Sequence, residues 1–184
     1  MVFQEPLTAL NPVLTIGRQL TETILRHESV SQAQAQHKAI QQLERVRIPQ
    51  AAARLAQYPH ELSGGQRQRL CIARALSVQP KLIIADEPVA ALDVSIARQI
   101  TDLMQELQQR LGVSFLFISH DLAVVERLCH RIAVMRAGRI VETGPTDAII
   151  GNPREDYSKG RIAAVPGRIA PAVGAMPERQ SLAG

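Results

Sequence analysis

Apolar residues recur at helical spacing in two stretches near the start of the chain. One stretch runs from residue 15 to 27 and the other from residue 31 to 46. Positions three and four apart lie on one face of an α-helix, so each stretch predicts an amphipathic helix. Ser31 is a candidate N-cap, and Pro49 is a stop signal after the second helix. The apolar positions are Ile16, Leu20 and Ile24, then Ala39, Ile40, Leu43 and Val46.

A third helical pattern follows the sequence LSGGQRQR, which begins at Leu62. We predict a helix from about Gly65 to Val78, ending before Pro80. Ser63 is a natural N-cap, and the glycines after it let backbone N–H groups approach an anion where the helix dipole is positive. The start of this helix therefore has the features of a phosphate site.

The pattern then changes to short, continuous apolar runs. LIIA at residues 82–85 and VSFLFI at residues 113–118 are typical of strands buried on both faces of a parallel sheet. Helical patterns occupy residues 94–111 and 122–129. Strand, helix and strand at these lengths predict a βαβ unit and an α/β fold. Val2 and Phe3 read as the end of a further strand.

The last part of the pattern predicts a hairpin joined to that sheet. Its strands are residues 131–135 and 139–143, connected by Arg136-Ala-Gly138, and a short helix follows at residues 147–151. From residue 167 to 184 the sequence is rich in Gly, Ala and Pro without a period, and we expect it to be disordered.

Composition narrows the class of protein. A hydrophobic content of 46% supports a folded core, while no apolar run is long enough to span a bilayer, so we expect a cytoplasmic protein. The net charge of +4 comes with only 3% aromatic residues, which leaves few platforms for stacking bases, so we expect no nucleic-acid partner. Cys71 and Cys129 lack metal-site spacing and are expected to be buried, reduced thiols.

Polar residues follow both predicted strands. Asp86 and Glu87 end one, and His120 lies just beyond the other. Because ligands bind outside the carboxyl ends of parallel strands, these side chains are expected to face one crevice. A carboxylate there suits Mg²⁺, a second one can orient a water for attack on a phosphoryl group, and a histidine can bind either. Taken singly, the acids and the histidine could equally be caps.

The sequence lacks the glycine-rich loop that usually accompanies such a phosphate site. The sequence contains no G-x-x-x-x-G-K-[ST] loop, and its three lysines, Lys38, Lys81 and Lys159, all lie in other contexts. The LSGGQ stretch is therefore half of a nucleotide site.

The order LSGGQRQR, LIIADEP, ALD and FISHD resembles the ATP-binding cassette (ABC) ATPase family, from Val2 to about Pro166. The resemblance implies an incomplete P-loop NTPase-like nucleotide-binding domain with a mainly parallel sheet and an inserted helical subdomain. It implies a partial ATPase domain over residues 1–166, with the helical subdomain at about 12–75 and the catalytic core at about 80–150.

The same resemblance implies the cofactors ATP and Mg²⁺ and a role for each matching residue. Asp86 would be the metal-binding Walker B aspartate, Glu87 the catalytic glutamate and His120 the switch histidine. Gln4 would be the glutamine that reaches Mg²⁺ and the attacking water, and that communicates with membrane subunits. The residues that bind nucleotide through the signature motif and the D-loop would be Ser63, Gly64, Gly65, Gln66 and Asp93.

The flanking sequences resemble the ATPases of peptide, nickel and glutathione importers, which implies import of peptides or similar small solutes. The chain departs from that pattern at Arg161-Ile162, where a leucine pair is usual, and at Val89-Ala90 beside the catalytic pair. It also lacks the cysteine-containing tail of many relatives, so no iron–sulfur function is carried over.

In this family two cassettes dimerise head to tail, and each ATP lies between the Walker A loop of one and the signature motif of the other. The implied partners are a second cassette, two membrane permeases at the cytoplasmic face of the membrane and, indirectly, a solute-binding protein. Arg67 and Arg69 are then expected to be exposed and paired with acids.

Two further hypotheses stay open. The chain could be a non-hydrolysing partner that lends its signature motif to another cassette, or a soluble ABC ATPase acting in DNA repair or translation. Without a Walker A loop, the isolated chain is not expected to hydrolyse ATP at family-like rates. It is also expected to expose an apolar patch on its sheet and to be poorly soluble alone.

Overall fold

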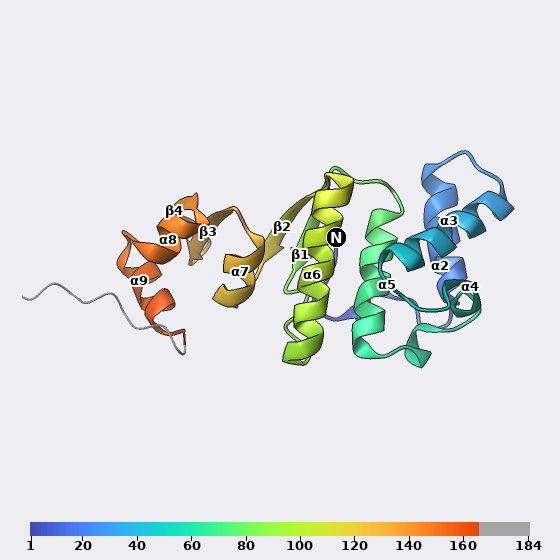
Figure 1. The fold of residues 1–184 in the computed structure, drawn as a ribbon, viewed down its shortest axis with the longest axis horizontal. Helices are drawn as coiled ribbons and strands as arrows, with labels where there is room; N and C mark the ends of the chain where they lie inside the picture. Colours follow the sequence, from blue (N-terminus) through green and yellow to red (C-terminus); the bar gives the residue numbers. More distant parts are fainter. Residues whose placement is uncertain (166–184) are drawn as a thin grey trace, which may run out of the picture. The chain divides into compact units, whose positions relative to one another are not determined.

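The computed structural model describes residues 1–165. The expected disordered tail at 167–184 lies outside the described residues. The chain divides into two compact units, one comprising residues 1–124 and the other starting at Val125. Figure 1 shows both units along the ribbon. All of the residues that the resemblance identifies as site residues belong to the first unit.

The first unit contains the predicted helices and the parallel strands. Its helices are α1 (Pro6–Ala9), α2 (Ile16–His27), α3 (Gln32–Arg45), α4 (Ala51–Arg54), α5 (Gly64–Leu76) and α6 (Val94–Leu111), with a 3-10 turn, η1, at Pro59–Glu61. Its strands are β1 (Leu82–Asp86) and β2 (Ser114–Ile118), and α7 (Leu122–Leu128) crosses the division between the units.

Three helices begin at residues whose side chains cap them. Thr15 accepts a hydrogen bond from the backbone N–H of Arg18 at the start of α2. Ser31 and Ser63 form full capping boxes, with Gln34 in α3 and with Gln66 in α5. The predictions of these helices are confirmed, whereas α1, α4 and η1 were not predicted because their patterns are only three or four residues long.

The strands form the expected parallel pair. β1 and β2 pair in register from Leu82 opposite Ser114 to Asp86 opposite Ile118, and α6 is the crossover between them. Val2 adds a parallel bridge to the other side of β1, opposite Ala85. The predicted βαβ unit is confirmed, and so is the assignment of the first residues to the end of a strand.

The expectation that both strands are buried on both faces is wrong. Ile83 and Ala85 of β1 are buried, and the register puts them beside Phe115 and Phe117, which pack on the same core. On the opposite face, Leu82, Leu116 and Ile118 are about half exposed. The helices of the unit cover one face of the sheet, so the side chains of the other face stay open. The expected apolar patch on the sheet is confirmed there.

The core of the first unit is centred on α5. This helix contacts α1, α2, α3 and α6, and Figure 1 shows it between α6 and the α2–α3 pair. Its buried residues join one cluster with the apolar faces of the neighbouring helices and with β1. Fully buried members of this cluster include Ile16, Leu20, Ile24, Leu43, Leu70, Ile72, Ile83, Ile100, Leu103 and Met104.

The second unit contains the predicted hairpin and two helices. Its elements are β3 (Arg131–Arg136), β4 (Arg139–Pro145), α8 (Thr146–Gly151) and α9 (Asp156–Ala163). Ala137 and Gly138 both have positive φ, 48° and 78°, as a tight hairpin turn requires. The hairpin and the short helix are confirmed, while α9 was not predicted.

The prediction that the hairpin joins the parallel sheet is wrong. Within residues 1–165, β3 and β4 pair only with each other, as an antiparallel sheet of their own. The tight turn fixes the pairing of the two strands with each other, but nothing in their pattern specifies a third strand.

Both cysteines carry free thiols. Cys71 is buried, as expected, and burial raises the pKa of its thiol to about 11, against a smaller lowering by Arg74. Cys129 is only half-buried, and burial raises its pKa as well. No helix within residues 1–165 is long and apolar enough to cross a membrane.

Candidate functional site

Glu87 and His120 meet at the carboxyl ends of the two parallel strands. The Nδ1 atom of His120 lies 2.8 Å from the Oε1 atom of Glu87. Since a carboxylate only accepts hydrogen bonds, Nδ1 carries the hydrogen of this contact. The Glu87 side chain is 25% exposed and that of His120 is 66% exposed. The pair is therefore open to solvent and to a ligand, and its predicted proximity is confirmed.

The backbone of Glu87 is held in an unusual conformation. Its φ is +45°, in the left-handed region that non-glycine residues seldom adopt. Its N–H donates to the carbonyl of Ile118 at 2.8 Å, and its own carbonyl accepts from Ala90 at 3.2 Å. The link to β2 extends the strand pairing by one residue. It thereby holds the carboxylate beside the chain that leads to His120.

Asp86 and Gln4 lie on adjoining segments of the sheet. The N–H of Asp86 donates to the carbonyl of Val2 at 2.9 Å, two residues before Gln4. Asp86 is half-buried and Gln4 is exposed. Within residues 1–165 neither side chain makes a hydrogen bond, so their oxygens are open to a ligand.

The signature residues are joined to one another at the start of α5. Ser63 Oγ accepts from the Gln66 N–H at 3.3 Å, and Gln66 Oε1 accepts from the Ser63 N–H at 3.0 Å. These two bonds satisfy two of the free backbone donors at the helix end. The side chain of Ser63 is exposed and that of Gln66 is half-buried, so this face can be reached from solvent.

The two signature glycines face the start of α6. A Cβ atom at Gly64 would lie 3.6 Å from Leu92, in ordinary contact, whereas one at Gly65 would lie only 2.7 Å from Cγ2 of Ile96. Asp93 sits between these two contacts as the exposed N-cap residue of α6, and its side chain makes no capping bond. The structure thus brings the signature motif and the predicted D-loop together.

The expectation for Arg67 and Arg69 is wrong. Both are half-buried, and within residues 1–165 neither is paired with an acid. Arg69 instead donates to the carbonyl of Val46 at 2.9 Å and to Oε1 of Gln99 at 3.4 Å. Burial, followed by the nearby Arg47 charge, lowers the pKa of the Arg69 guanidinium. The tertiary fold thus gives Arg69 neutral hydrogen-bond acceptors in place of the expected acidic partners.

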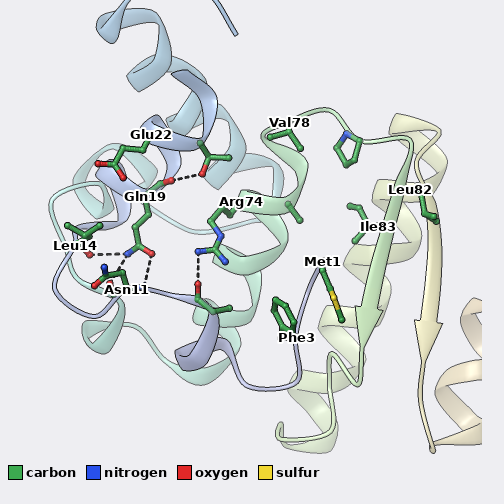
Figure 2. A pocket seen from close by; sticks show the side chains of 14 residues that line it. Met1, Phe3, Asn11, Leu14, Gln19, Glu22, Arg74, Val78, Leu82 and Ile83 are labelled. Atoms are coloured by element: carbon green, nitrogen blue, oxygen red, sulfur yellow. Dashed lines mark hydrogen bonds between the residues drawn. The ribbon is translucent and has the colours of Figure 1, made fainter. Parts of the chain in front are cut away.

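A hollow of about 570 Å³ opens beside Phe3, the residue before Gln4, between the first residues, α2, α5 and β1. Figure 2 shows Gln19, Arg74, Met1 and Phe3 around it. Gln19 is fixed by hydrogen bonds to Asn11 and to the carbonyl of Leu14. Met1 and Phe3 are 52% and 41% exposed, which gives the rim an apolar character.

The oxygen atoms available at this site suit Mg²⁺ bound together with a phosphate, and they are too few for a metal ion held by protein ligands alone. No group of three or more His, Cys, Asp or Glu side chains within residues 1–165 is placed to hold an ion. Mg²⁺ prefers oxygen ligands and is commonly held by one or two carboxylates together with phosphate and water. The open carboxylate of Asp86 and the amide oxygen of Gln4 suit that mode.

Comparison with known proteins gives this arrangement a family. The model of the ABC transporter family matches residues 1–90. The chain is 50% identical over 166 residues to the oligopeptide transport ATP-binding protein OppD of Bacillus subtilis, covering 90% of the chain and 46% of that protein. It is 52% identical, over the same length, to a putative peptide import ATP-binding protein of Brucella melitensis, covering 49% of it.

The chain is part of an ABC transporter ATP-binding domain. It spans about half the length of the curated relatives that it matches. The predicted family and the predicted α/β cassette fold are both confirmed.

Solved ABC cassettes share this fold. One is cbiO1 of Clostridium perfringens, part of the ABC transporter complex cbiONQ, with a TM-score of 0.72 and 27% identity over 82% of this chain and 58% of that one. Another is the dimeric ATP-binding cassette MJ0796 in a post-hydrolysis state bound to ADP and Pi, with a TM-score of 0.66 and 26% identity over 79% of this chain and 62% of that one.

One set of residues in this ABC domain was not predicted from the sequence. Gln68, Cys71 and Arg74 all point from α5 to the backbone of the segment that carries Gln4. Their spacing of three residues in the chain was a usable signal, because it places them along one side of the helix. Their acceptors are backbone carbonyls, which no side-chain pattern reveals.

Proposed function

We propose that this chain is part of an ATP-hydrolysing subunit that powers the import of peptides or similar small solutes. The observation that carries the proposal is the 2.8 Å contact between His120 and Glu87 at the ends of β1 and β2. The names of the most similar relatives, which are peptide transport and import ATP-binding proteins, support the solute class.

Glu87 is proposed as the catalytic carboxylate. Its partial burial and fixed backbone suit a group that orients the attacking water and accepts its proton. The Nδ1–H of His120 holds that carboxylate in place, and the two side chains together are proposed to orient the water and the transferred phosphoryl group. In these proposed roles the pair acts on a phosphate bound beyond the strand ends.

Asp86 and Gln4 are proposed to hold Mg²⁺ together with the nucleotide. The bound ion would supply neutralisation of the charge that develops on the phosphate oxygens. The β- and γ-phosphates are proposed to be bound by a Walker A loop outside these 184 residues, since the sequence has no such motif.

The signature face is proposed to act in trans. Ser63, Gly64, Gly65 and Gln66 lie at a helix N-terminus, which favours an anion, and Asp93 is exposed beside them. In a head-to-tail dimer this face would cover the ATP held by the second cassette. The dimeric state of the solved cassette supports this arrangement.

The hollow beside Phe3 is proposed as the contact with a membrane permease. Its apolar rim and its position beside the residue before Gln4 suit a docking segment whose movement reaches the site. Two permeases and, indirectly, a solute-binding protein would complete the transporter, with this subunit at the cytoplasmic face of the membrane. Nucleic acid is not among the proposed partners.

The experiment for the signature face uses the chain as it stands. It is mixed with a full-length relative that carries a Walker A loop, and ATP hydrolysis is measured. The chain should raise the rate, and Ser63→Arg should abolish the increase because the larger cation blocks the helix N-terminus. An Arg18→Met variant, altered at an exposed pair on α2, is the control and should still stimulate. Equal stimulation by the Ser63→Arg chain would contradict a trans role.

The same experiment addresses the non-hydrolysing alternative. That hypothesis predicts stimulation but no contribution from Glu87, whereas a hydrolytic subunit requires Glu87 for turnover at its own site. A variant of Glu87 in the full-length subunit therefore separates the two.

A further inference from the structure

One side of α5 carries three hydrogen-bond donors that contact the segment containing Gln4. Nε2 of Gln68 donates to the carbonyl of Phe3 at 3.4 Å, and Sγ of Cys71 lies 3.9 Å from the carbonyl of Pro6. Nη1 of Arg74 donates to the carbonyl of Ala9 at 2.6 Å, as drawn in Figure 2. Donors and acceptors both repeat every three residues, so the helix runs alongside the segment and holds it at three successive points.

Two of the donors, Gln68 and Cys71, occupy buried positions where an apolar side chain would ordinarily stand. Gln68 is 1% exposed and Cys71 is 3% exposed, in the middle of the core cluster. Oε1 of Gln68 is buried without a hydrogen-bond partner within residues 1–165. A buried amide with an unsatisfied oxygen costs stability, so an apolar residue of the same size would be favoured if packing were the only requirement.

The thiol of Cys71 can serve as a donor under ordinary conditions. Burial raises its pKa to about 11, so it keeps its hydrogen at neutral pH. Arg74 is charged and makes the shortest of the three contacts, which is typical of a charge-assisted bond.

The contact of Gln68 falls on the peptide bond that joins Phe3 to Gln4. Because that unit is planar, a hold on the Phe3 carbonyl also fixes the orientation of the Gln4 nitrogen. One residue earlier, Val2 is hydrogen-bonded to β1 through Ile84 and Asp86, at 2.8 and 2.9 Å. Gln4 therefore follows two consecutive peptide units, of which the first is held by the sheet and the second by α5.

Gln68 is also only two residues from the signature motif. The capping box of Ser63 and Gln66 forms the first turn of the same helix. A displacement of the signature motif along with α5 would thus move the carbonyl of Phe3.

We propose that Gln68 is a positioning residue that fixes Gln4 relative to the signature motif, and that Cys71 and Arg74 extend this hold to Ala9. The consequence for catalysis rests on the proposed function. The hold on the segment itself does not, because it is a property of this chain without nucleotide.

Amide hydrogen exchange of the chain tests the hold directly. Gln68→Glu keeps the shape of the side chain but replaces the donor with a carboxylate that repels the Phe3 carbonyl. Exchange in residues 3–12 should become about tenfold faster or more, because local opening no longer breaks these contacts, while α2 and α3 keep their rates. Arg74→Met is a second variant that removes the Ala9 contact and should speed exchange near residue 9.

Gln42→Glu is the matched control. Gln42 is a buried glutamine of α3 whose Oε1 also lacks a partner within residues 1–165, and among these described residues no hydrogen bond joins its side chain to residues 3–9. Its replacement should leave exchange in residues 3–12 at the wild-type rate relative to the rest of the unit. Unchanged exchange there in Gln68→Glu, or the same uniform increase in both variants, would overturn the proposal.

A double-mutant cycle in the full-length subunit tests the catalytic consequence. Gln68→Glu should lower kcat for ATP hydrolysis about tenfold, and should have little further effect in a Gln4→Ala background, because coupled residues are not additive. Fully multiplicative effects would overturn the positioning role. If the wild-type subunit hydrolyses no ATP, the proposed function fails, and the exchange experiment still decides whether Gln68 holds the segment.

Discussion

Gly65 at the start of α5 packs directly against Ile96 in the first turn of α6. A Cβ atom added at Gly65 would lie 2.7 Å from Cγ2 of Ile96, closer than real Cβ contacts allow. The signature motif and the start of α6, which follows Asp93, are therefore held together by a contact that only glycine permits.

Gly65→Ala is expected to destabilise the chain. The added methyl group has to displace Ile96 or shift the helix, and overpacking of this kind costs about 1–3 kcal/mol. Gly64→Ala is the matched control, because its Cβ would be 3.6 Å from Leu92, an ordinary distance. Urea unfolding of the two variants measures the difference, and equal stabilities would show that the Gly65 contact is not tight.

A double-mutant cycle tests whether Ile96 is the residue that the added methyl group of Gly65→Ala contacts. Ile96→Ala removes Cγ2, so Gly65→Ala should cost less in the Ile96→Ala background than in the wild type. A coupling of at least about 0.5 kcal/mol is expected for residues in direct contact. Additive effects on the free energy of unfolding would assign the strain to some other neighbour.

Arg69→Met is expected to destabilise the chain by about 1–3 kcal/mol, since it leaves the buried carbonyl of Val46 without its donor. The loss should depend little on salt, because the acceptors of Arg69 are neutral. Arg47→Met breaks an ion pair with Glu106 on a partly exposed surface and should have a smaller effect that fades as salt rises. Unfolding at low and high salt distinguishes the two, and an Arg69 effect that fades as salt rises would point to an acidic partner.

Because the pKa of the Cys71 thiol is raised, we expect the chain to lose stability at alkaline pH. Its pKa is raised by burial from 9.0 to about 11, so the folded chain keeps a proton that the unfolded chain releases. Stability from this group is therefore present below pH 9 and falls between about pH 9 and 11, by about 3 kcal/mol in total. Cys71→Ala should flatten the curve in that window relative to the wild type, and parallel curves would contradict the assignment.

Local features of this fold could be predicted from the sequence. Ser31 and Ser63 cap their helices through residues three positions later, so a short window contains the whole interaction. The strands and the position of Glu87 and His120 followed from the βαβ pattern, because parallel strands bring their carboxyl ends to one edge.

Features that depend on distant segments could not be predicted. The exposure of Leu116 and Ile118 is set by which face of the sheet the helices cover, and an apolar run looks the same either way. Arg69 finds its acceptor 23 residues away, and Gln68 finds its own 65 residues away on a backbone carbonyl. Glu87 has a positive φ and a hydrogen bond to Ile118, and that bond forms only once the two strands are paired.

Glu87, held by His120, is proposed to orient the attacking water and accept its proton. The most direct measurement compares nucleotide binding with single-turnover ATP hydrolysis in the full-length subunit carrying Glu87→Gln. The glutamine keeps the size of the side chain but cannot accept the proton, so hydrolysis should fall by at least about 10²-fold while ATP binding is retained. Hydrolysis at the wild-type rate in that variant would contradict the account.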